Sequence, residues 1–382
     1  MLGVDPTANA IHLGNLSQIV TGKQFIAAGH TLCLVIGGGT ARIGDPSGRS
    51  LERPLLVEEQ IAANTAALLR DIPNLFTPTE QKQLHVLNNN DWLGHVSLIE
   101  FLRDTGKHFR LGTMLGKDSV RSRLQDQGIS FTEFAYMLLQ AFDFHHLHAT
   151  YGVTVQIGGS DQWGNITAGI DLIGRRADPT LPSGAVHGVT TKLLTNSKGE
   201  KLGKSAGNAL WLTGPDASPY ALYQFLRNVP DSDVLRLLSS LTLLSLPTEE
   251  EYDFHLEEDP RYWQKILAAE VVRICHGEEG VQAALAQSAA AFSSAAMPPV
   301  VDGETLASWS DYDSFADVLI AKGGATSRKA ARRLVDQGGV KLNGEKVGSW
   351  ENLEQRWTES KRRNEPLHIR AGKRVAFWVS GA

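Results

Sequence analysis

Residues 31–39, TLCLVIGGG, place the strongest constraint on how this chain can fold. An unbroken apolar run that ends in glycines is typical of a strand buried on both faces and closed by a tight turn. It follows a helical pattern at 16–29, LSQIVTGKQFIAAG, which itself follows the short strand-like segment LGVD at 2–5. Strand, helix and buried strand in this order predict an α/β fold with a doubly wound, Rossmann-like parallel sheet.

Composition narrows the class of protein. The chain has 382 residues, which suits two or three domains. Hydrophobic residues make up 42% and charged residues 21%, so disorder is not expected. The net charge of -5 argues against a uniformly basic nucleic-acid-binding protein but permits local basic patches, which the C-terminal sequence supplies.

Cysteine usage and hydropathy favour a cytoplasmic protein. Cys33 and Cys275 lie far apart without metal-ligand spacing, so neither a disulfide framework nor a structural zinc site is expected. This usage fits a reducing compartment. The sequence shows no run of about 18 apolar residues and no signal-peptide pattern, so neither a membrane protein nor a secreted one is expected.

The pattern along the chain predicts three domains and a linker. Residues from about 55 to 150 have a helical pattern. The next segment, TVQIGGSDQWGN, predicts a strand that ends in a glycine turn. The segment after it, TKLLTNSKGEKLGKSAGNALWL, predicts a strand, a mobile loop and a second strand. Apolar residues at three and four spacing then predict helices, and an Ala-, Ser- and Pro-rich stretch predicts a linker. A helix at 325–337 followed by two short strands around Asn343 and Gly344 closes the chain. The predicted boundaries are a Rossmann-like domain at 1–213, a helical domain at 214–295, a linker at 296–312 and a small α+β domain at 313–382.

The segment NAIHLGNL contains a candidate phosphate-binding turn. His12 and Asn15 lie three residues apart around Gly14, where a helix begins. A helix N-terminus offers unpaired backbone N–H groups and a positive dipole end, and both side chains can donate to phosphate oxygens. The alternative is a helix cap with an incidental histidine.

A polar stripe marks the helix EFAYMLLQAFDF. At about 100° per residue, Tyr136, Gln140 and Asp143 fall within about 60° of one another on an otherwise apolar helix. If the helix is buried, the stripe must face a pocket for a small polar ligand, because each unpaired buried polar group would cost about 1 to 3 kcal/mol. A surface stripe is the alternative.

Two later segments have features of a nucleotide site. In GGSDQWGN, glycines at a strand end bring backbone N–H groups toward a ligand, Asp161 can accept from ribose hydroxyls, and Gln162 can donate and accept. In GEKLGKS, Lys201 and Lys204 stand beside Ser205 on a glycine-bearing loop, where ammonium groups can neutralise a pyrophosphate leaving group. A reverse turn and a solvated lysine loop are the alternatives.

Taken in order, these segments resemble the class I aminoacyl-tRNA synthetases. HLGN stands where that class carries His-Ile-Gly-His, and KLGKS where it carries Lys-Met-Ser-Lys-Ser. The polar stripe, GGSDQWGN and IGDPSG resemble the bacterial tyrosyl-tRNA synthetase family in particular, and the resemblance covers nearly the whole chain. The last 70 residues resemble the small RNA-binding domain first described in a ribosomal protein.

The resemblance implies a role for each matching residue. Those expected to bind tyrosine are Asp45, Tyr136, Gln140, Asp143, Gln156 and Gln162. Those expected to bind ATP are Gly3, Asp5, Gly14, Gly159, Asp161 and Lys204. The expected catalytic residues, on the phosphate turn and the mobile loop, are Thr7, His12, Asn15, Arg49, Arg53, Lys201, Lys204 and Ser205. The expected RNA contacts, on a basic helix-turn-strand unit, are Ser327, Arg328, Arg332, Arg333 and Lys341.

The implied reaction joins L-tyrosine to ATP as tyrosyl-adenylate and then transfers it to tRNA(Tyr). Mg²⁺ is expected with the ATP phosphates, without a metal site of the protein's own or a prosthetic group, and a homodimer is expected. Alternatives are an inactive synthetase-like RNA-binding protein, a tryptophanyl-tRNA synthetase and a nucleotidyltransferase with only the phosphate turn. The two lysines argue against a pure RNA-binding protein, and Asp143 favours tyrosine.

The sequence departs from the family pattern at two places. Asn15 replaces the second histidine of the class motif, and its amide can still donate a hydrogen bond. Met1 falls where the family has a tyrosine that binds the substrate hydroxyl, and Leu2 at a further ribose-contact position. The alignment also implies that about thirty residues of the family pattern precede Met1.

Overall fold

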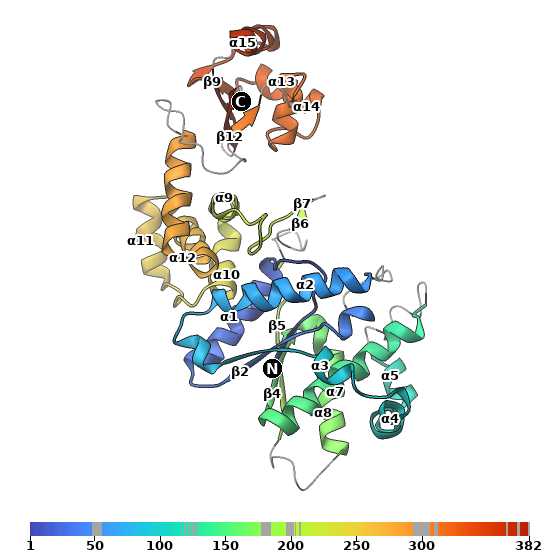
Figure 1. Ribbon diagram of the computed structural model, residues 1–382. Helices are drawn as coiled ribbons and strands as arrows, with labels where there is room; N and C mark the ends of the chain where they lie inside the picture. The colour runs from blue at the N-terminus through green and yellow to red at the C-terminus, as the bar shows by residue number, and fades with distance from the viewer. Residues whose placement is uncertain are drawn as a thin grey trace. The chain divides into compact units, whose positions relative to one another are not determined.

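The computed structural model describes most of the chain, in two compact units (Figure 1). The described residues are 1–47, 56–117, 120–121, 124, 128–176, 185–195, 202, 204–205, 208–292, 306–308, 312–363, 366–372 and 375–380. One unit comprises Met1–Ser218 and Pro230–Cys275, and the other comprises Pro219–Val229 and His276–Ala382. None of the described helices is both long and apolar enough to cross a membrane.

A parallel sheet in the order β3-β2-β1-β4-β5 forms the centre of the first unit. Its strands are β1 (Leu2–Val4), β2 (Leu32–Ile36), β3 (Leu84–Asn88), β4 (Val155–Gly159) and β5 (His187–Thr191). All five residues of β2 are buried, as its unbroken apolar run predicts. Leu2 pairs with Leu34 on one side and with Ile157 on the other, so β1 is central although it is short.

The order of the strands confirms the doubly wound fold and locates its ligand-binding edge. The chain moves outward from β1 to β2 and β3, then returns to the other side of β1 with β4 and β5. The helices α1 (Leu13–Ala27) and α2 (Glu58–Asp71) lie in the connections between β1, β2 and β3 (Figure 1). The helices α7 (Phe131–Tyr151) and α8 (Trp163–Arg175) precede and follow β4. Loops after neighbouring strands diverge where the order reverses, so a crevice is expected at the carboxyl ends of β1 and β4.

The region from about 55 to 150 is not wholly helical, which corrects the sequence prediction. Residues 84–88 form β3, an edge strand whose residues are half-buried or exposed, so its sequence lacks the apolar run that identifies β2. Short helical segments fill the remainder, namely η2 (Ile72–Leu75), η3 (Glu80–Gln83), α3 (Asn90–Leu93), α4 (Leu98–Glu100), η4 (Phe101–Thr105), η5 (Gly106–His108) and α5 (Leu111–Leu115).

The strand expected to start at Thr191 instead ends there. Residues 187–191, HGVTT, pair with β4 along its whole length, and the chain leaves the sheet after Thr191. Leu193 and Leu194 then turn toward the cavity described below, so their apolar character reflects that surface and not a strand core. The hairpin strands β6 (Lys204–Ser205) and β7 (Asn208–Ala209) follow.

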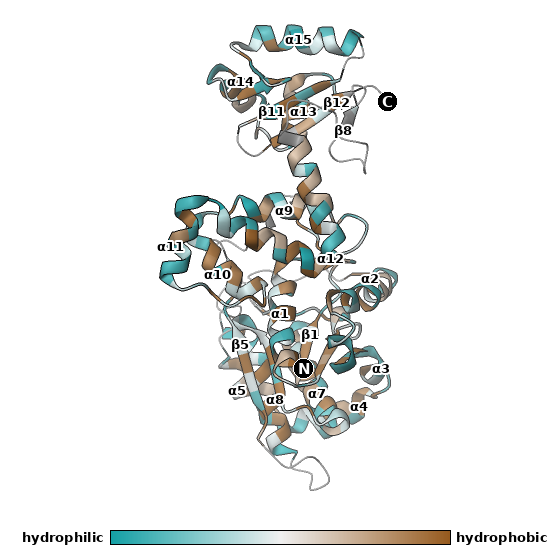
Figure 2. Cartoon of the chain, turned by 90° about the vertical axis from the view of Figure 1, so that its left-hand side faces the viewer, coloured by the Kyte–Doolittle hydropathy of each residue, from teal (hydrophilic) through white to brown (hydrophobic). Residues whose placement is uncertain are grey.

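Among its described residues, the region predicted as a helical domain contains four labelled helices, the last of which is kinked at Gly277. They are α9 (Pro219–Arg227), α10 (Asp231–Leu241), α11 (Glu249–Glu258) and α12 (Tyr262–Phe292). Their contacts divide between the two units: α10 packs on α1 in the first, and α9 belongs to the second. Figure 2 shows α11 as mostly hydrophilic, in line with its sequence EEEYDFHLEE. The predicted boundaries at 213 and 295 stay predictions.

The C-terminal part of the second unit is a small α+β domain. Its sheet has the order β10-β9-β11-β12-β8, and the helices α13 (Phe315–Ala321), α14 (Arg328–Asp336) and α15 (Trp350–Arg363) accompany it. The strands are β8 (Leu306–Ser308), β9 (Val340–Leu342), β10 (Glu345–Lys346), β11 (Leu367–Ala371) and β12 (Val375–Ser380). Asn343 and Gly344 have φ of 49° and 86°, the conformation of a two-residue hairpin turn, so the predicted hairpin is confirmed.

The predicted linker at 296–312 is wrong in one part. Leu306–Ser308 form β8, which pairs in parallel with β12 through Trp378 and Leu306. A strand of three residues is too short to show a periodic pattern within an Ala-, Ser- and Pro-rich stretch. Its pairing partner lies about seventy residues later in the chain, so no neighbouring residues indicate the pairing either. Most of the other linker residues lie outside the described part of the chain.

Candidate active site

A cavity of about 280 Å³ opens at the carboxyl ends of β1 and β4, where the strand order reverses. The predicted site residues that line it are Gly3, Asp5, Thr7, His12, Gly14, Asn15, Asp45, Tyr136, Gln140, Asp143, Gln156, Gly159, Asp161 and Gln162. These residues come from β1, α1, α7, β4 and the loops between them. The fold therefore brings together side chains that are up to about 150 positions apart.

His12 caps the N-terminus of α1 and also faces the cavity. Its Nδ1 accepts from the backbone N–H of Asn15 at 3.3 Å, and the Asn15 side-chain oxygen accepts from the backbone N–H of His12 at 3.1 Å. Because Nδ1 is an acceptor, the neutral ring carries its proton on Nε2 and can donate from there. The structure thus shows the helix cap, and the phosphate-binding role of this turn stays a prediction.

Gly14 leaves room for the His12 ring in that turn. A Cβ at this position would lie 3.0 Å from Cε1 of His12, which is tighter than an ordinary contact. The cap geometry, with an extended His12 backbone before the first turn of α1, would have to shift to admit it.

The chain beyond the lysine loop is attached directly to the phosphate turn. Leu212 donates its backbone N–H to the carbonyl of Ile11 at 3.0 Å, and Ile11 donates to Oγ1 of Thr213 at 3.2 Å. At the other end of the loop, Leu202 donates to the carbonyl of Leu194 at 3.1 Å. Of the predicted loop residues, Arg49, Arg53 and Lys201 lie outside the described residues, and Lys204 and Ser205 are described only as backbone of β6.

One wall of the cavity holds a buried tyrosine and a carboxylate. The Tyr136 hydroxyl donates to Oδ2 of Asp5 at 2.8 Å, and the Thr40 hydroxyl donates to Oδ1 of the same carboxylate at 2.8 Å. Burial, with the nearby charges of Asp5 and Asp45, raises the pKa of Tyr136 well above its ordinary value. The phenol therefore stays protonated and orients Asp5.

A second carboxylate, Asp45, lies among amide groups. It accepts from Nε2 of Gln162 at 2.6 Å and from the backbone N–H of Ser47 at 2.9 Å. Nδ2 of Asn165 lies 3.0 Å from Oε1 of Gln140 and 3.4 Å from Oδ1 of Asp45, which links α8 with α7 and the Asp45 loop. Two carboxylates on one cavity, each held in place by donors, can bind an ammonium group.

The buried Asp143 accepts from two donors that the sequence did not single out. Nδ2 of Asn89 donates to Oδ2 at 2.9 Å, and Nε1 of Trp92 donates to Oδ1 at 2.7 Å. Burial raises the pKa of Asp143 to about 7, although the bonds from Asn89 and Trp92 lower it. Asn89 also donates to the Thr40 hydroxyl at 3.0 Å, so Asp143 and Asp5 belong to one network. The polar segment NNNDW follows a strand and could have indicated Asn89 and Trp92 as site residues. The helical prediction for residues 55–150 missed that strand, so the segment was not singled out.

Gln156 and Met1 complete the cavity beside Asp143. Gln156 is 1% exposed, its Nε2 lies 3.5 Å from the Met1 sulfur, and its Oε1 has no hydrogen-bond partner among the described residues. Met1 is also buried and packs with Cys33 and Val35. A buried amide oxygen without a partner at a cavity wall is an available acceptor for a ligand.

The predicted RNA contacts lie together in the C-terminal domain but in different surroundings. Ser327 is the N-cap of α14 and accepts from the backbone N–H of Ala330 at 3.2 Å. Arg328 pairs with Asp317 at 2.8 Å, and the Arg332 guanidinium lies 5.6 Å from the centre of the Trp350 ring. Arg333 is exposed on α14.

Lys341 belongs to a basic row across the C-terminal sheet. Its Cα is paired with Lys346 of β10 on one side and with Arg370 of β11 on the other. Directly paired residues of antiparallel strands point to the same face, so three cations share one face of the sheet. The adjacent Leu342 and Ile369 are fully buried on the opposite face.

Comparison with known proteins gives consistent matches. Residues 1–293 match the model of the tRNA synthetases class I (W and Y), and residues 316–349 match the S4 domain. The chain is 41% identical over 395 residues to the tyrosine--tRNA ligase of Staphylococcus carnosus (strain TM300), covering 99% of this chain and 90% of the relative. It is 39% identical over 388 residues to that of Staphylococcus saprophyticus subsp. saprophyticus, covering 99% and 91%. The solved structure of a C-terminally truncated Aspergillus nidulans mitochondrial tyrosyl-tRNA synthetase aligns with a TM-score of 0.64 and 31% identity, over 75% of this chain and 84% of that one.

Proposed function

The chain belongs to the tRNA synthetases of class I (W and Y), and we propose that it is a tyrosine–tRNA ligase that activates L-tyrosine with ATP and transfers it to tRNA(Tyr). The observation that carries the proposal is the presence in one cavity of two differently held carboxylates. Asp143 accepts from Asn89 and Trp92, whereas Asp45 accepts from Gln162 and the backbone of Ser47.

Asp143 supplies the selection of tyrosine. Its two oxygens are fixed by Asn89 and Trp92, and each carboxylate oxygen can accept more than one hydrogen bond, so the phenolic hydroxyl of tyrosine can add its own. Phenylalanine would fill the same space and leave a buried acceptor without this partner. Tyrosyl-tRNA synthetases are the standard example of such discrimination by an unpaired polar group.

The Asp45 side of the cavity receives the α-ammonium group of the substrate. Asp45 provides negative charge, Tyr136 and Gln140 of α7 stand one turn apart along the same wall, and Asp5, which we assign to ATP, accepts from the Tyr136 hydroxyl. Because donors already orient both carboxylates, binding requires little rearrangement. Gln156 and Gln162 provide amide groups for the remaining polar atoms of the substrate.

The phosphate turn and the strand ends accommodate ATP. The N-terminus of α1 offers its first N–H groups, Nε2 of His12 can donate to a phosphate oxygen, and Asn15 and Thr7 lie beside it. Glycine at 159 leaves room for the Asp161 carboxylate, since a Cβ would lie 2.7 Å from Oδ1, and Gly3 has open space above it. We assign Gly3, Gly159 and Asp161 to the ribose.

In this proposal, Mg²⁺ binds together with ATP. Among the described residues no group of three or more His, Cys, Asp or Glu side chains is arranged to hold a metal ion. Phosphate oxygens would be the main ligands of an ATP-bound ion.

Catalysis follows from orientation and charge. An oxygen of the tyrosine carboxylate attacks the α-phosphorus, the bond to the β-phosphate bridging oxygen breaks, and pyrophosphate leaves with tyrosyl-adenylate remaining. His12, the α1 N-terminus and the loop lysines Lys201 and Lys204 stabilise the leaving group, with Arg49 and Arg53 reinforcing that loop. A terminal ribose hydroxyl of the tRNA then attacks the tyrosyl carbonyl carbon and AMP leaves.

The S4 domain supplies the tRNA-binding surface in this proposal. Arg332, Arg333 and Lys341, with Arg328 and the Ser327 cap, form the basic helix and strand that would meet the phosphate backbone. Such contacts position the RNA without reading its sequence.

A homodimer and a cytoplasmic location complete the proposal. Large apolar side chains are exposed on α4, with Leu98 at 70% and Ile99 at 72%, and at the start of α7, with Phe131 at 77%. We assign these side chains to an interface with a second copy of the chain. Two cysteines without a disulfide between them fit a reducing compartment.

Amino-acid-dependent exchange between ATP and labelled pyrophosphate tests the proposed function. We expect exchange with tyrosine and none above background with tryptophan or phenylalanine at the same concentration. Exchange with tryptophan would reassign the substrate. Tight tRNA binding without any exchange would favour the RNA-binding alternative.

A further inference from the structure

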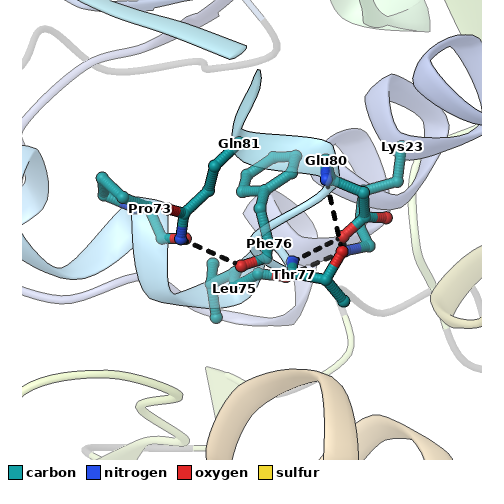
Figure 3. Close-up of polar contacts among 7 residues, drawn as sticks. All are labelled: Lys23, Pro73, Leu75, Phe76, Thr77, Glu80 and Gln81. Atoms are coloured by element: carbon teal, nitrogen blue, oxygen red, sulfur yellow. Dashed lines mark hydrogen bonds and ion pairs between the residues drawn. The ribbon is translucent and has the colours of Figure 1, made fainter. Parts of the chain in front are cut away.

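Lys23 is buried in the middle of α1, outside the cavity. The residue is 3% exposed, and its Nζ donates to the carbonyl of Leu75 at 2.9 Å and to Oε2 of Glu80 at 2.6 Å (Figure 3). The same nitrogen lies 4.8 Å from the centre of the Phe76 ring. A buried ammonium group is tolerated only when its donors are matched, and here a carbonyl, a carboxylate and an aromatic face surround it.

The acceptors around Lys23 are held by bonds of their own. Glu80 Oε2 also accepts from the backbone N–H of Thr77 at 2.7 Å, and Nε2 of Gln81 donates to the carbonyls of Pro73 at 2.9 Å and Phe76 at 3.1 Å (Figure 3). Burial raises the pKa of Glu80, but the bonds from Lys23 and Thr77 outweigh it and hold that pKa below its ordinary value. The turn at 73–81 is thus a fixed receptor for the lysine.

Lys23 joins α1, which carries the phosphate turn, to the segment that precedes the edge strand β3. Toward the N-terminus, α1 runs three turns back to the His12 cap and Asn15. The 73–81 turn leads directly into β3, which pairs with β2 at all five of its residues, so the sheet itself holds Asn89 and its bond to Asp143.

Apolar packing alone leaves the axial position of α1 poorly fixed. Its buried residues are spread around the helix and include Leu13, Leu16, Ile19, Val20 and Ile26. Contacts of this kind are non-directional, so they resist separation more than sliding or rotation. Gly22 makes the approach to β2 close, since a Cβ there would lie 2.8 Å from Leu32. The bonds of Lys23 add a directional restraint in the C-terminal part of α1, besides the bond from Nε2 of Gln18 to Oγ1 of Thr191 at 2.6 Å.

We propose that Lys23 is a positioning residue for adenylate formation, which holds α1 on the 73–81 turn so that His12 and Asn15 meet the ATP phosphates in register with the sheet. The inference rests on the proposed function. Small displacements of catalytic groups cost large factors in rate, and the residues assigned to tyrosine lie on β1, β4, α7 and loops outside α1. Loss of the Lys23 bonds should therefore lower the rate of the chemical step and leave the affinity for tyrosine unchanged.

The test compares Lys23→Met with the double variant Lys23→Met/Glu80→Gln in tyrosine-dependent pyrophosphate exchange. Lys23→Met leaves Glu80 without its cation and lowers stability, and the double variant recovers stability because no carboxylate is then left unpaired. We expect kcat about tenfold below wild type in both variants, with KM and Kd for tyrosine within about twofold. Lys82→Met is the matched control, since Lys82 is exposed on the same turn, and it should behave as wild type.

Two results would overturn the inference while leaving the proposed function intact. One is that kcat and stability of the double variant both return to the wild-type values. The bonds of Lys23 would then have only a structural role. The other is a rise in tyrosine KM that matches the fall in kcat. If the wild-type protein is folded but shows no tyrosine-dependent pyrophosphate exchange, the proposed function is wrong, and the inference fails with it.

Discussion

Trp92 donates its indole N–H to Asp143 at 2.7 Å, across 51 positions of sequence. Asn89 completes the arrangement from the same segment, so the end of β3 fixes the carboxylate that α7 presents to the cavity. Recognition of the substrate ring thus depends on an edge strand as well as on the central helix.

Replacing Asp143 by Asn should reduce the preference for tyrosine over phenylalanine. The amide occupies the same volume but presents one acceptor oxygen in place of two, so we expect kcat/KM for tyrosine to fall about 100-fold in pyrophosphate exchange, with phenylalanine little changed. Asp91→Asn is the control, because Asp91 is exposed next to Trp92. Unchanged discrimination in Asp143→Asn would show that another group reads the hydroxyl.

The same carboxylate makes the free energy of unfolding depend on pH. Burial raises the pKa of Asp143 to about 7, above the ordinary 3.8, so the folded protein retains a proton that the unfolded chain releases. This contribution to stability is full below pH 4 and is lost as the pH rises through 7. Relative to wild type, Asp143→Asn should gain up to about 4 kcal/mol between pH 4 and pH 8, measured by urea unfolding. An identical pH dependence in both proteins would contradict this assignment.

The role of His12 as a phosphate donor can be separated from its role as a cap. His12→Asn retains a side chain that caps helices well but removes the Nε2 donor, so α1 should remain stable. We expect kcat for pyrophosphate exchange to fall about 100-fold with the tyrosine KM unchanged. His30→Asn, at the exposed far end of α1, should have no effect. A similar loss at His30 would indicate a general disturbance of the helix.

In the S4 domain, arginines with different partners should contribute differently to tRNA binding. Arg333→Ala removes an exposed cation and should reduce the slope of log affinity against log salt by about 1, while exchange without tRNA stays at the wild-type rate. Arg328→Ala should change the slope less, because Asp317 already neutralises that charge. Equal slopes for both variants and wild type would place the RNA elsewhere.

The predictable parts of the molecule are those with strong local signals. The apolar run of β2, the capped start of α1 and the Asn343-Gly344 turn each define an element from a few neighbouring residues. The strand β3 lacks this signal because it lies at the sheet edge, and β8 lacks it because its partner is distant in sequence. Asn89 and Trp92 were missed for the same reason, since their importance follows from the position of β3 beside β2. Tyr136, Gln140 and Asp143 could be predicted because they are polar residues on one face of an otherwise apolar helix, whereas Gly3, Asp5, Asp45 and Gln156 were expected only from the resemblance to the family.

The strand β8 also decides where a C-terminal fragment of this chain can begin. It covers the outer edge of β12, so a fragment that starts at residue 313 would leave the N–H and C=O groups along that edge without their partners. An open edge of this kind pairs readily with another copy of itself. A fragment that includes Leu306–Ser308 retains the pairing of β12 with β8, which makes it the better choice for studying the RNA-binding domain alone.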